Sequence, residues 1–338
     1  MTYLFRLNRS AALLLSATGL LTGPVPLKSQ SAAPQSPPAQ SPTNQALTDD
    51  WEKSAGGRQY FDVASVKPNT SHNGTSNEAV SLNVSVAPGD VFTPTGGLFS
   101  GTNVLLVSYI NFAFKLTGNQ VQLLFPQLPK WALDAHFDIQ ARAAGNSTKN
   151  QLRMMMQSLL EDRFKLASHY ETRQLPVFAA ILARPGKTGP QLRPHLEDVP
   201  CSTVPPPPSV AGSELAPVLA APGGFPSVCG GIVGMRASVP GRLRVGARNV
   251  GIGMLASTLS QMSGLGRPVI DQTGLTGTFD FTFEWTPQQN SPDVNSQPDD
   301  AGPTFLESLK QQLGLELKPQ TGPVKIFVID HIEMPTEN

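Results

Sequence analysis

The sequence predicts an α+β protein made of two related small units, each a mixed β-sheet with two helices packed on one face. Extended segments with alternating apolar residues occur twice, and segments with helical apolar spacing lie beside each of them. These features also recur in the same order along the chain, which indicates an internal repeat.

Each unit opens with a turn and a short strand that ends in asparagine, at 94–103 and 240–249. A helix is predicted after both. The apolar residues that predict it are Leu106, Tyr109, Ile110 and Ala113 in the first unit and Ile252, Leu255, Leu259 and Met262 in the second. Asn103 and Asn249 are predicted to cap these helices, because an asparagine side chain can accept a hydrogen bond from the first turn.

Both units continue with a half-buried strand, Phe137–Ala141 or Phe279–Phe283, whose alternate residues share one face. A second helix follows, predicted from Met156, Leu160 and Phe164 in the first unit and from Leu309, Leu313 and Leu315 in the second. Each helix is expected to lead into a strand, and a separate Pro-Val strand closes each unit, at Pro176–Leu182 and Pro323–Ile329.

The N-terminus has the features of a secretory signal peptide, which we place at residues 1–31. Arg6 and Arg9 precede an uncharged, largely apolar run from Ala11 to Leu21. The run is shorter than the roughly 20 residues that span a bilayer as a helix, although an uncleaved anchor remains an alternative. We therefore expect export to the periplasm or beyond, with no integral membrane span after cleavage.

Composition divides the remaining chain into four parts. Residues 32–57 are predicted to be a disordered linker rich in Ser, Pro, Gln and Ala, 58–199 the first α+β unit and 231–338 the second. Between them, 200–230 is a Pro/Gly-rich insert with the two cysteines, Cys201 and Cys229, near its ends. Two cysteines in an exported chain most often pair, so a disulfide is favoured over a redox or nucleophilic cysteine.

Charge and motifs exclude several functions. The 25 basic and 25 acidic residues balance, which argues against nucleic acid as a partner. We recognise no cofactor motif and expect no cofactor. One polar group is worth naming: His169 with Glu171, and His331 with Glu333, share strand faces near the ends of the two units. If the fold joined them they could bind a metal or exchange protons, whereas the plainer reading is an exposed strand face.

Several separate motifs also resemble an exported family of unknown function that is abundant in acidobacterial genomes. They span about residues 58–338 and include Phe61–Asn69, Asp162–Leu166, Gly266–Gly277, Glu284–Pro287 and Val328–His331. The resemblance implies no catalytic residue. The layout of 249–332 is also similar to the short N-terminal domain of secretins and TonB-dependent transporters, which implies a role in protein contacts.

The favoured interpretation is an exported, non-enzymatic binding or protein-interaction protein whose partner is another envelope protein. An uncharacterised hydrolase or metal-dependent enzyme is the first alternative. A small-molecule binding protein is the second, and it requires an apolar pocket between the units. The sequence does not predict the oligomeric state.

Overall fold

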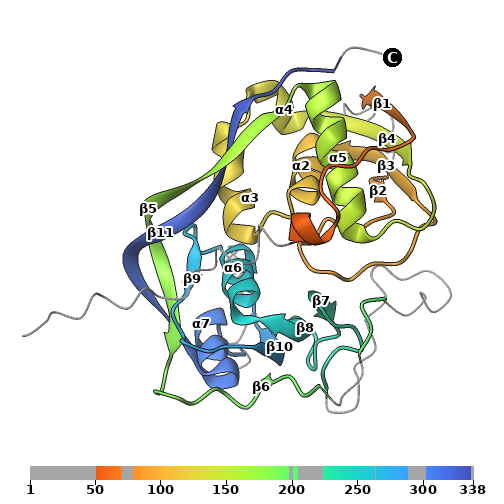
Figure 1. Cartoon of the computed structure of the whole chain (residues 1–338). Coiled ribbons are helices and arrows are strands. Elements are labelled where there is room, and N and C mark those ends of the chain that lie inside the picture. Colours follow the sequence, from red (N-terminus) through yellow and green to blue (C-terminus); the bar gives the residue numbers. More distant parts are fainter. Residues whose placement is uncertain are drawn as a thin grey trace, which may run out of the picture. The chain divides into compact units, whose positions relative to one another are not determined.

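The computed structural model describes residues 51–70, 79–197, 201–204, 224–262, 264–287 and 302–335. These residues form three β-sheets with associated helices (Figure 1), so the α+β class is confirmed. The predicted signal peptide and most of the predicted linker lie outside the described residues.

The first sheet is antiparallel and has the strand order β1-β4-β3-β2. Its strands are β1 (Val63–Asn69), β2 (Ser81–Leu82), β3 (Leu98–Leu105) and β4 (His136–Arg142). The helices of this region are α2 (Leu106–Ala113), α3 (Gly118–Leu124), the 3-10 turn η2 (Phe125–Gln127), α4 (Lys130–Asp134) and α5 (Lys149–Phe164). As the alternation predicts, Phe137, Ile139 and Ala141 are buried in one core with α2 and α5.

The second sheet is also antiparallel, with the order β6-β10-β8-β7. Its strands are β6 (Leu192–Pro194), β7 (Gly231–Met235), β8 (Leu243–Gly251) and β10 (Thr278–Trp285). The helices α6 (Ile252–Met262) and α7 (Phe305–Ser308), with the π-helical turn η4 (Leu309–Leu313), belong to this region. Phe279, Phe281 and Phe283 pack with α6 and η4 in a second core, as predicted.

The third sheet is the mixed one and contains two long strands. β5 (Ala167–Leu182) and β11 (Leu315–His331) pair antiparallel along their whole length, and β9 (Val269–Asp271) runs parallel to β5. In Figure 1 they run past α4 and α3 and reach α7 at their lower end. Phe327 of β11 joins the first core and Leu315 joins the second, so this pair of strands connects the two cores.

Two predictions about the strands are wrong. The four-stranded sheets are antiparallel rather than mixed, because the parallel pairing is confined to β5 and β9. The Pro-Val segments also do not form separate strands, since Pro176 and Pro323 lie within the continuous β5 and β11. A strand can contain proline where its missing N–H would point away from the neighbouring strand.

The predicted helix caps are also wrong. Asn103 and Asn249 adopt left-handed backbone conformations, with φ of 54° and 53°, at irregular points of β3 and β8. Their backbone N–H groups donate to Asp138 Oδ1 (2.8 Å) and Asp280 Oδ1 (2.9 Å). Asparagine tolerates this conformation better than most residues, so each Asn forms a bulge held by an aspartate on the next strand.

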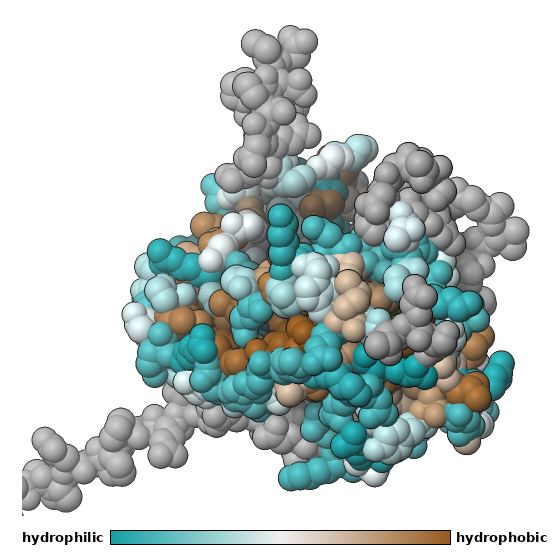
Figure 2. Space-filling model, turned by 90° about the horizontal axis from the view of Figure 1, so that it is seen from above, coloured by the Kyte–Doolittle hydropathy of each residue, from teal (hydrophilic) through white to brown (hydrophobic). Residues whose placement is uncertain are grey.

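The described residues begin at Trp51, within the predicted linker of residues 32–57. Residues 51–54 form a helical turn, and the buried Trp51 packs against Ala55 and Met154 of α5. A large aromatic side chain at the end of a polar segment can anchor it to a core. Figure 2 shows one face of the molecule, on which apolar residues gather near the middle among hydrophilic ones.

Candidate functional site

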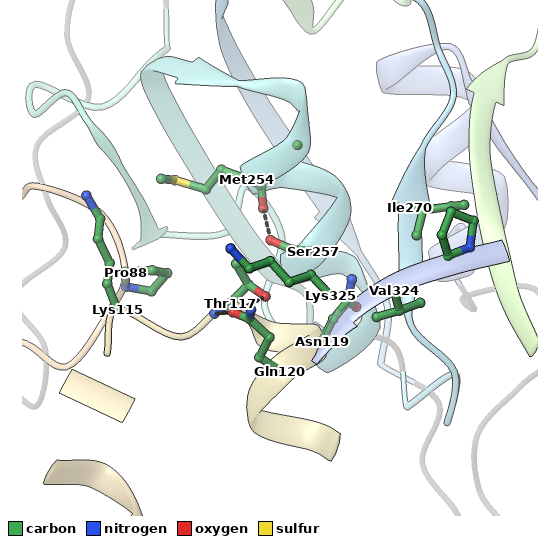
Figure 3. Close-up of a pocket in the computed structure, with 12 residues that line it drawn as sticks. Pro88, Lys115, Thr117, Asn119, Gln120, Met254, Ser257, Ile270, Val324 and Lys325 are labelled. Carbon is green, nitrogen blue, oxygen red and sulfur yellow. Dashed lines mark hydrogen bonds between the residues drawn. The ribbon is translucent and has the colours of Figure 1, made fainter. Parts of the chain in front are cut away.

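A cavity of about 140 Å³ lies among α3, α6, β9, β11 and the loop at Pro88 (Figure 3). Its walls come from α3 beside the first sheet, from α6 beside the second sheet, and from β9 and β11 of the third sheet. Pro88, Met254, Ile270 and Val324 supply apolar surface. Thr117, Gln120 and Ser257 supply polar groups. A small-molecule binding protein was predicted to need an apolar pocket between the two units, and this cavity is a small one beside elements of both regions.

The N-terminus of α3 positions one side of this cavity. Thr117 and Gln120 form a capping box, in which the Thr117 N–H donates to Gln120 Oε1 (2.9 Å). Two residues into the helix, the Asn119 amide donates to Val269 O (2.8 Å) and accepts from Val269 N–H (3.0 Å). Asn119 thereby satisfies the open edge of β9 and fixes α3 against it.

Two lysines give the cavity its charge. Lys115 Nζ lies 3.1 Å from Asp90 Oδ1, and burial lowers the pKa of its ammonium although Asp90 opposes the change. Lys325 Nζ lies 4.6 Å from the centre of the Tyr170 ring. In Figure 3 the Lys325 side chain extends from β11 across the cavity, toward Thr117 and Ser257. An apolar wall with two cationic amines suits a small amphipathic anion.

Buried cations of α5 hold the loop that carries Pro88. Lys149 Nζ donates to the carbonyls of Ala87 (3.0 Å), Gly89 (2.7 Å) and Val91 (3.2 Å). The fully buried Arg153 donates from Nη2 to the Ala87 and Gly89 carbonyls at 3.0 and 3.1 Å. Burial, with the neighbouring Arg153, lowers the pKa of Lys149 to about 7. Sequence reasoning missed both residues, because charged side chains in a helix usually lie at the surface.

The predicted disulfide between Cys201 and Cys229 is confirmed, with Cα atoms 5.6 Å apart. Residues near each cysteine accept hydrogen bonds from the same loop. The Phe92 N–H donates to Thr203 O (2.8 Å), and the Asp90 N–H donates to Gly230 O (2.7 Å). The disulfide therefore supports the loop that lines the cavity, although it lies outside the cavity itself.

The predicted polar group divides into separate pairs of side chains. His169 Nδ1 lies 2.8 Å from Asp330 Oδ2, and His331 Nε2 lies 2.7 Å from Glu333 Oε1. Glu171 pairs with Arg173. His169, His331 and Glu333 are exposed and Glu171 is half-buried. Across the described ranges no group of three or more His, Cys, Asp or Glu is placed to hold a metal.

Comparison with known proteins gives a family and no activity. A family model described as a protein of unknown function matches residues 107–332, more than half of the chain. The chain belongs to the DUF3738 family. No curated protein and no solved structure matches it. In the part of this DUF3738 protein that the structure describes, no helix is long and apolar enough to cross a membrane.

Proposed function

We propose that this DUF3738 protein is an exported, non-enzymatic binding protein that takes a small amphipathic carboxylate in the cavity of Figure 3. One observation carries the proposal: elements on both sides of the cavity supply a largely apolar wall, with Lys115 and Lys325 at its border. We expect export from the predicted signal peptide and from the disulfide, because disulfides persist mainly in oxidising compartments.

The size of the cavity limits the ligand. An apolar cavity of about 150 Å³ is enough for benzene in a protein core. The cavity here, at about 140 Å³, therefore suits a ligand of that size whose charged group reaches the border. Benzoate is a suitable probe, and benzamide is its neutral counterpart of nearly the same shape.

Calorimetric titration of the oxidised, full mature chain tests this function. We expect benzoate to bind and benzamide to bind at least tenfold more weakly, since the lysines favour a charged ligand. Lys325→Met should reduce benzoate affinity by a similar factor. Lys318→Met is the matched control, because Lys318 is an exposed lysine of the same strand outside the cavity. Equal affinity for both probes, or equal effects of the two variants, would contradict the proposal.

Export has its own test. N-terminal sequencing of the protein recovered from the cell envelope should begin near Ser31. A chain that is recovered from the cytoplasm with its first residues intact would contradict export, and the binding experiment would be unaffected by that result.

We also propose that the chain arose by duplication of one α+β unit. The support is local and specific. The segment Lys67-Pro68-Asn69 pairs with β4 as Arg193-Pro194-His195 lies against β10, with Pro68 opposite Phe137 and Pro194 opposite Phe279. Each Phe precedes the aspartate that holds an Asn bulge.

The ends of the second helices support the same proposal. Lys165 after α5 and Gly314 after η4 both have left-handed conformations, with φ of 51° and 72°, and a long strand follows each. Sequence profiles of the two regions, built from relatives, should align Asp138 with Asp280 and Lys165 with Gly314. An alignment in another register would count against duplication.

A further inference from the structure

A second cavity, of about 290 Å³, lies on the outer face of the second sheet, away from the cavity of Figure 3. Thr282 and Glu284 of β10 form its floor, and Arg242 and Arg244 come from the start of β8 and the turn before it. Gln191 lies beside Thr282. Every residue that lines this cavity is polar or charged, so we call it the polar basin.

Inside the polar basin the carboxylate is already satisfied. Glu284 accepts from Ser238 N–H (2.8 Å) and Ser238 Oγ–H (2.6 Å), with Arg242 Nη1 at 3.4 Å. Burial alone would raise the pKa of Glu284, but the bonds from Ser238 and the two arginines lower it below its ordinary value. Glu284 therefore remains ionised and fixes the turn that carries Arg242.

The arginines keep donors in reserve. Each guanidinium has five N–H groups. Among the hydrogen bonds within the described residues, Arg242 contacts Glu284 and Arg244 donates to Gly224 O (3.3 Å). Gln191 uses its amide oxygen to accept from Thr282 Oγ (2.9 Å). Among the described residues that line the basin, two arginines thus outweigh one carboxylate.

We propose that the polar basin binds a small hydrophilic oxyanion, such as the carboxylate of a sugar acid. Two guanidinium groups beside hydrogen-bonding amide and hydroxyl groups match a carboxylate with neighbouring hydroxyls, because arginine binds oxyanions through paired N–H groups. The absence of apolar lining residues separates this ligand class from the amphipathic carboxylate of the other cavity.

Titration of the oxidised mature chain with galacturonate, with galactose as the neutral control, tests the proposal. Galacturonate should bind and galactose should bind at least tenfold more weakly. Arg242→Met and Arg244→Met should each weaken galacturonate binding about tenfold or more, as expected for loss of a charged hydrogen bond. Arg236→Met is the matched control, since Arg236 is an exposed arginine nearby that does not line the basin.

Arg244→Lys keeps the positive charge and guards against a folding defect in Arg244→Met. It should bind galacturonate more weakly than the wild type, because an ammonium cannot form the paired contact. Inorganic phosphate that binds and is lost in the same variants also supports an oxyanion site. No binding of either anion at tens of millimolar, or binding unchanged in both arginine variants, overturns the proposal. Lys325→Met should leave galacturonate binding unchanged, so this result and the benzoate result are independent.

Discussion

The first and second sheets resemble each other on their inner faces and differ on their outer faces. In both, alternate aromatic or aliphatic residues of β4 or β10 are buried against helices. On the outer face of β4, Gln140 and Arg142 are exposed. At the matching positions of β10, Thr282 and Glu284 are only 3% and 9% exposed. One sheet face thus meets solvent, whereas the other is covered.

The segment that covers the outer face of the second sheet, which we call the cover, explains why polar and charged groups meet there. The arm of the disulfide that precedes Cys229 lies over this face: Arg193 stacks on the Phe225 ring at 5.6 Å, and Arg244 donates to Gly224 O. Polar groups that are removed from water need partners within the protein. Arginines, a carboxylate and amides meet there for this reason, and they leave the polar basin where the cover is incomplete.

The largest effect should follow from removal of the disulfide that ties this cover down. The Cys201→Ala/Cys229→Ala double variant should lose roughly 3–4 kcal/mol of unfolding free energy, as the chain-entropy model gives for a 28-residue separation. Denaturant titration measures the loss. Hydrogen exchange should increase more in β8 and β10 than in β3 and β4, because the cover lies only over the second sheet.

Wild-type protein with its disulfide reduced is the matched control. It should show the same loss of unfolding free energy and the same increase in hydrogen exchange as the double variant. Equal increases in exchange in both sheets would show that the cover contributes nothing specific to the second sheet.

The two bulge aspartates provide a second test of the comparison. Asp280 contacts Asn249 N–H, His195 Nδ1 at 2.7 Å and Arg248 Nε at 3.5 Å, and all of these groups are nearly buried. Asp280→Asn leaves a buried guanidinium without its counter-charge, which should cost about 3 kcal/mol.

Asp138→Asn is the matched variant in the first sheet. Asp138 accepts from Asn69 Nδ2 and Asn103 N–H, both at 2.8 Å, and these donors are neutral. The expected loss of unfolding free energy is therefore only about 1 kcal/mol. Equal losses in denaturant titrations of the two variants would mean that covering the second face does not strengthen its electrostatics.

Local patterns in the sequence predict much of this fold. Apolar spacing correctly predicts α2 and α6, and alternation predicts which residues of β4 and β10 face the cores. The cysteine pair follows from the cysteine count and the predicted export. The helix and strand predictions depend on residues that are close in the sequence. The disulfide prediction needs no such proximity, because the chain has only two cysteines.

Long-range pairing is less accessible to this kind of reasoning. Nothing in the alternation of 167–182 indicates that its partner is 315–331. Side-chain contacts to a strand edge cannot be predicted either. The Gln127 amide donates to Phe327 O (3.0 Å), but nothing in the sequence distinguishes Gln127 from a glutamine that only contacts solvent. The similarity between Lys67-Pro68-Asn69 and Arg193-Pro194-His195 could have indicated that both segments pair with a Phe-Asp strand. It is not evident in the sequence, because only the proline is identical.

The last predicted effect concerns the buried charge in the region of the first sheet. There the buried lysine and arginine of α5 lie under the loop at 87–91 rather than on a sheet face. The pKa of Lys149 is about 7 in the folded protein, below its ordinary 10.5. Between these values the unfolded chain binds a proton that the folded chain has lost, so the contribution of Lys149 to stability rises with pH. Relative to Lys149→Met, the wild type should gain about 2 kcal/mol of unfolding free energy between pH 7 and pH 9. Denaturant titrations of both proteins across this range measure the difference. If the difference in unfolding free energy between the two proteins stays constant with pH, the three carbonyls keep the Lys149 ammonium charged. The loop at 87–91 would then be bound by a permanent cation, as the covered face of the second sheet is by its arginines.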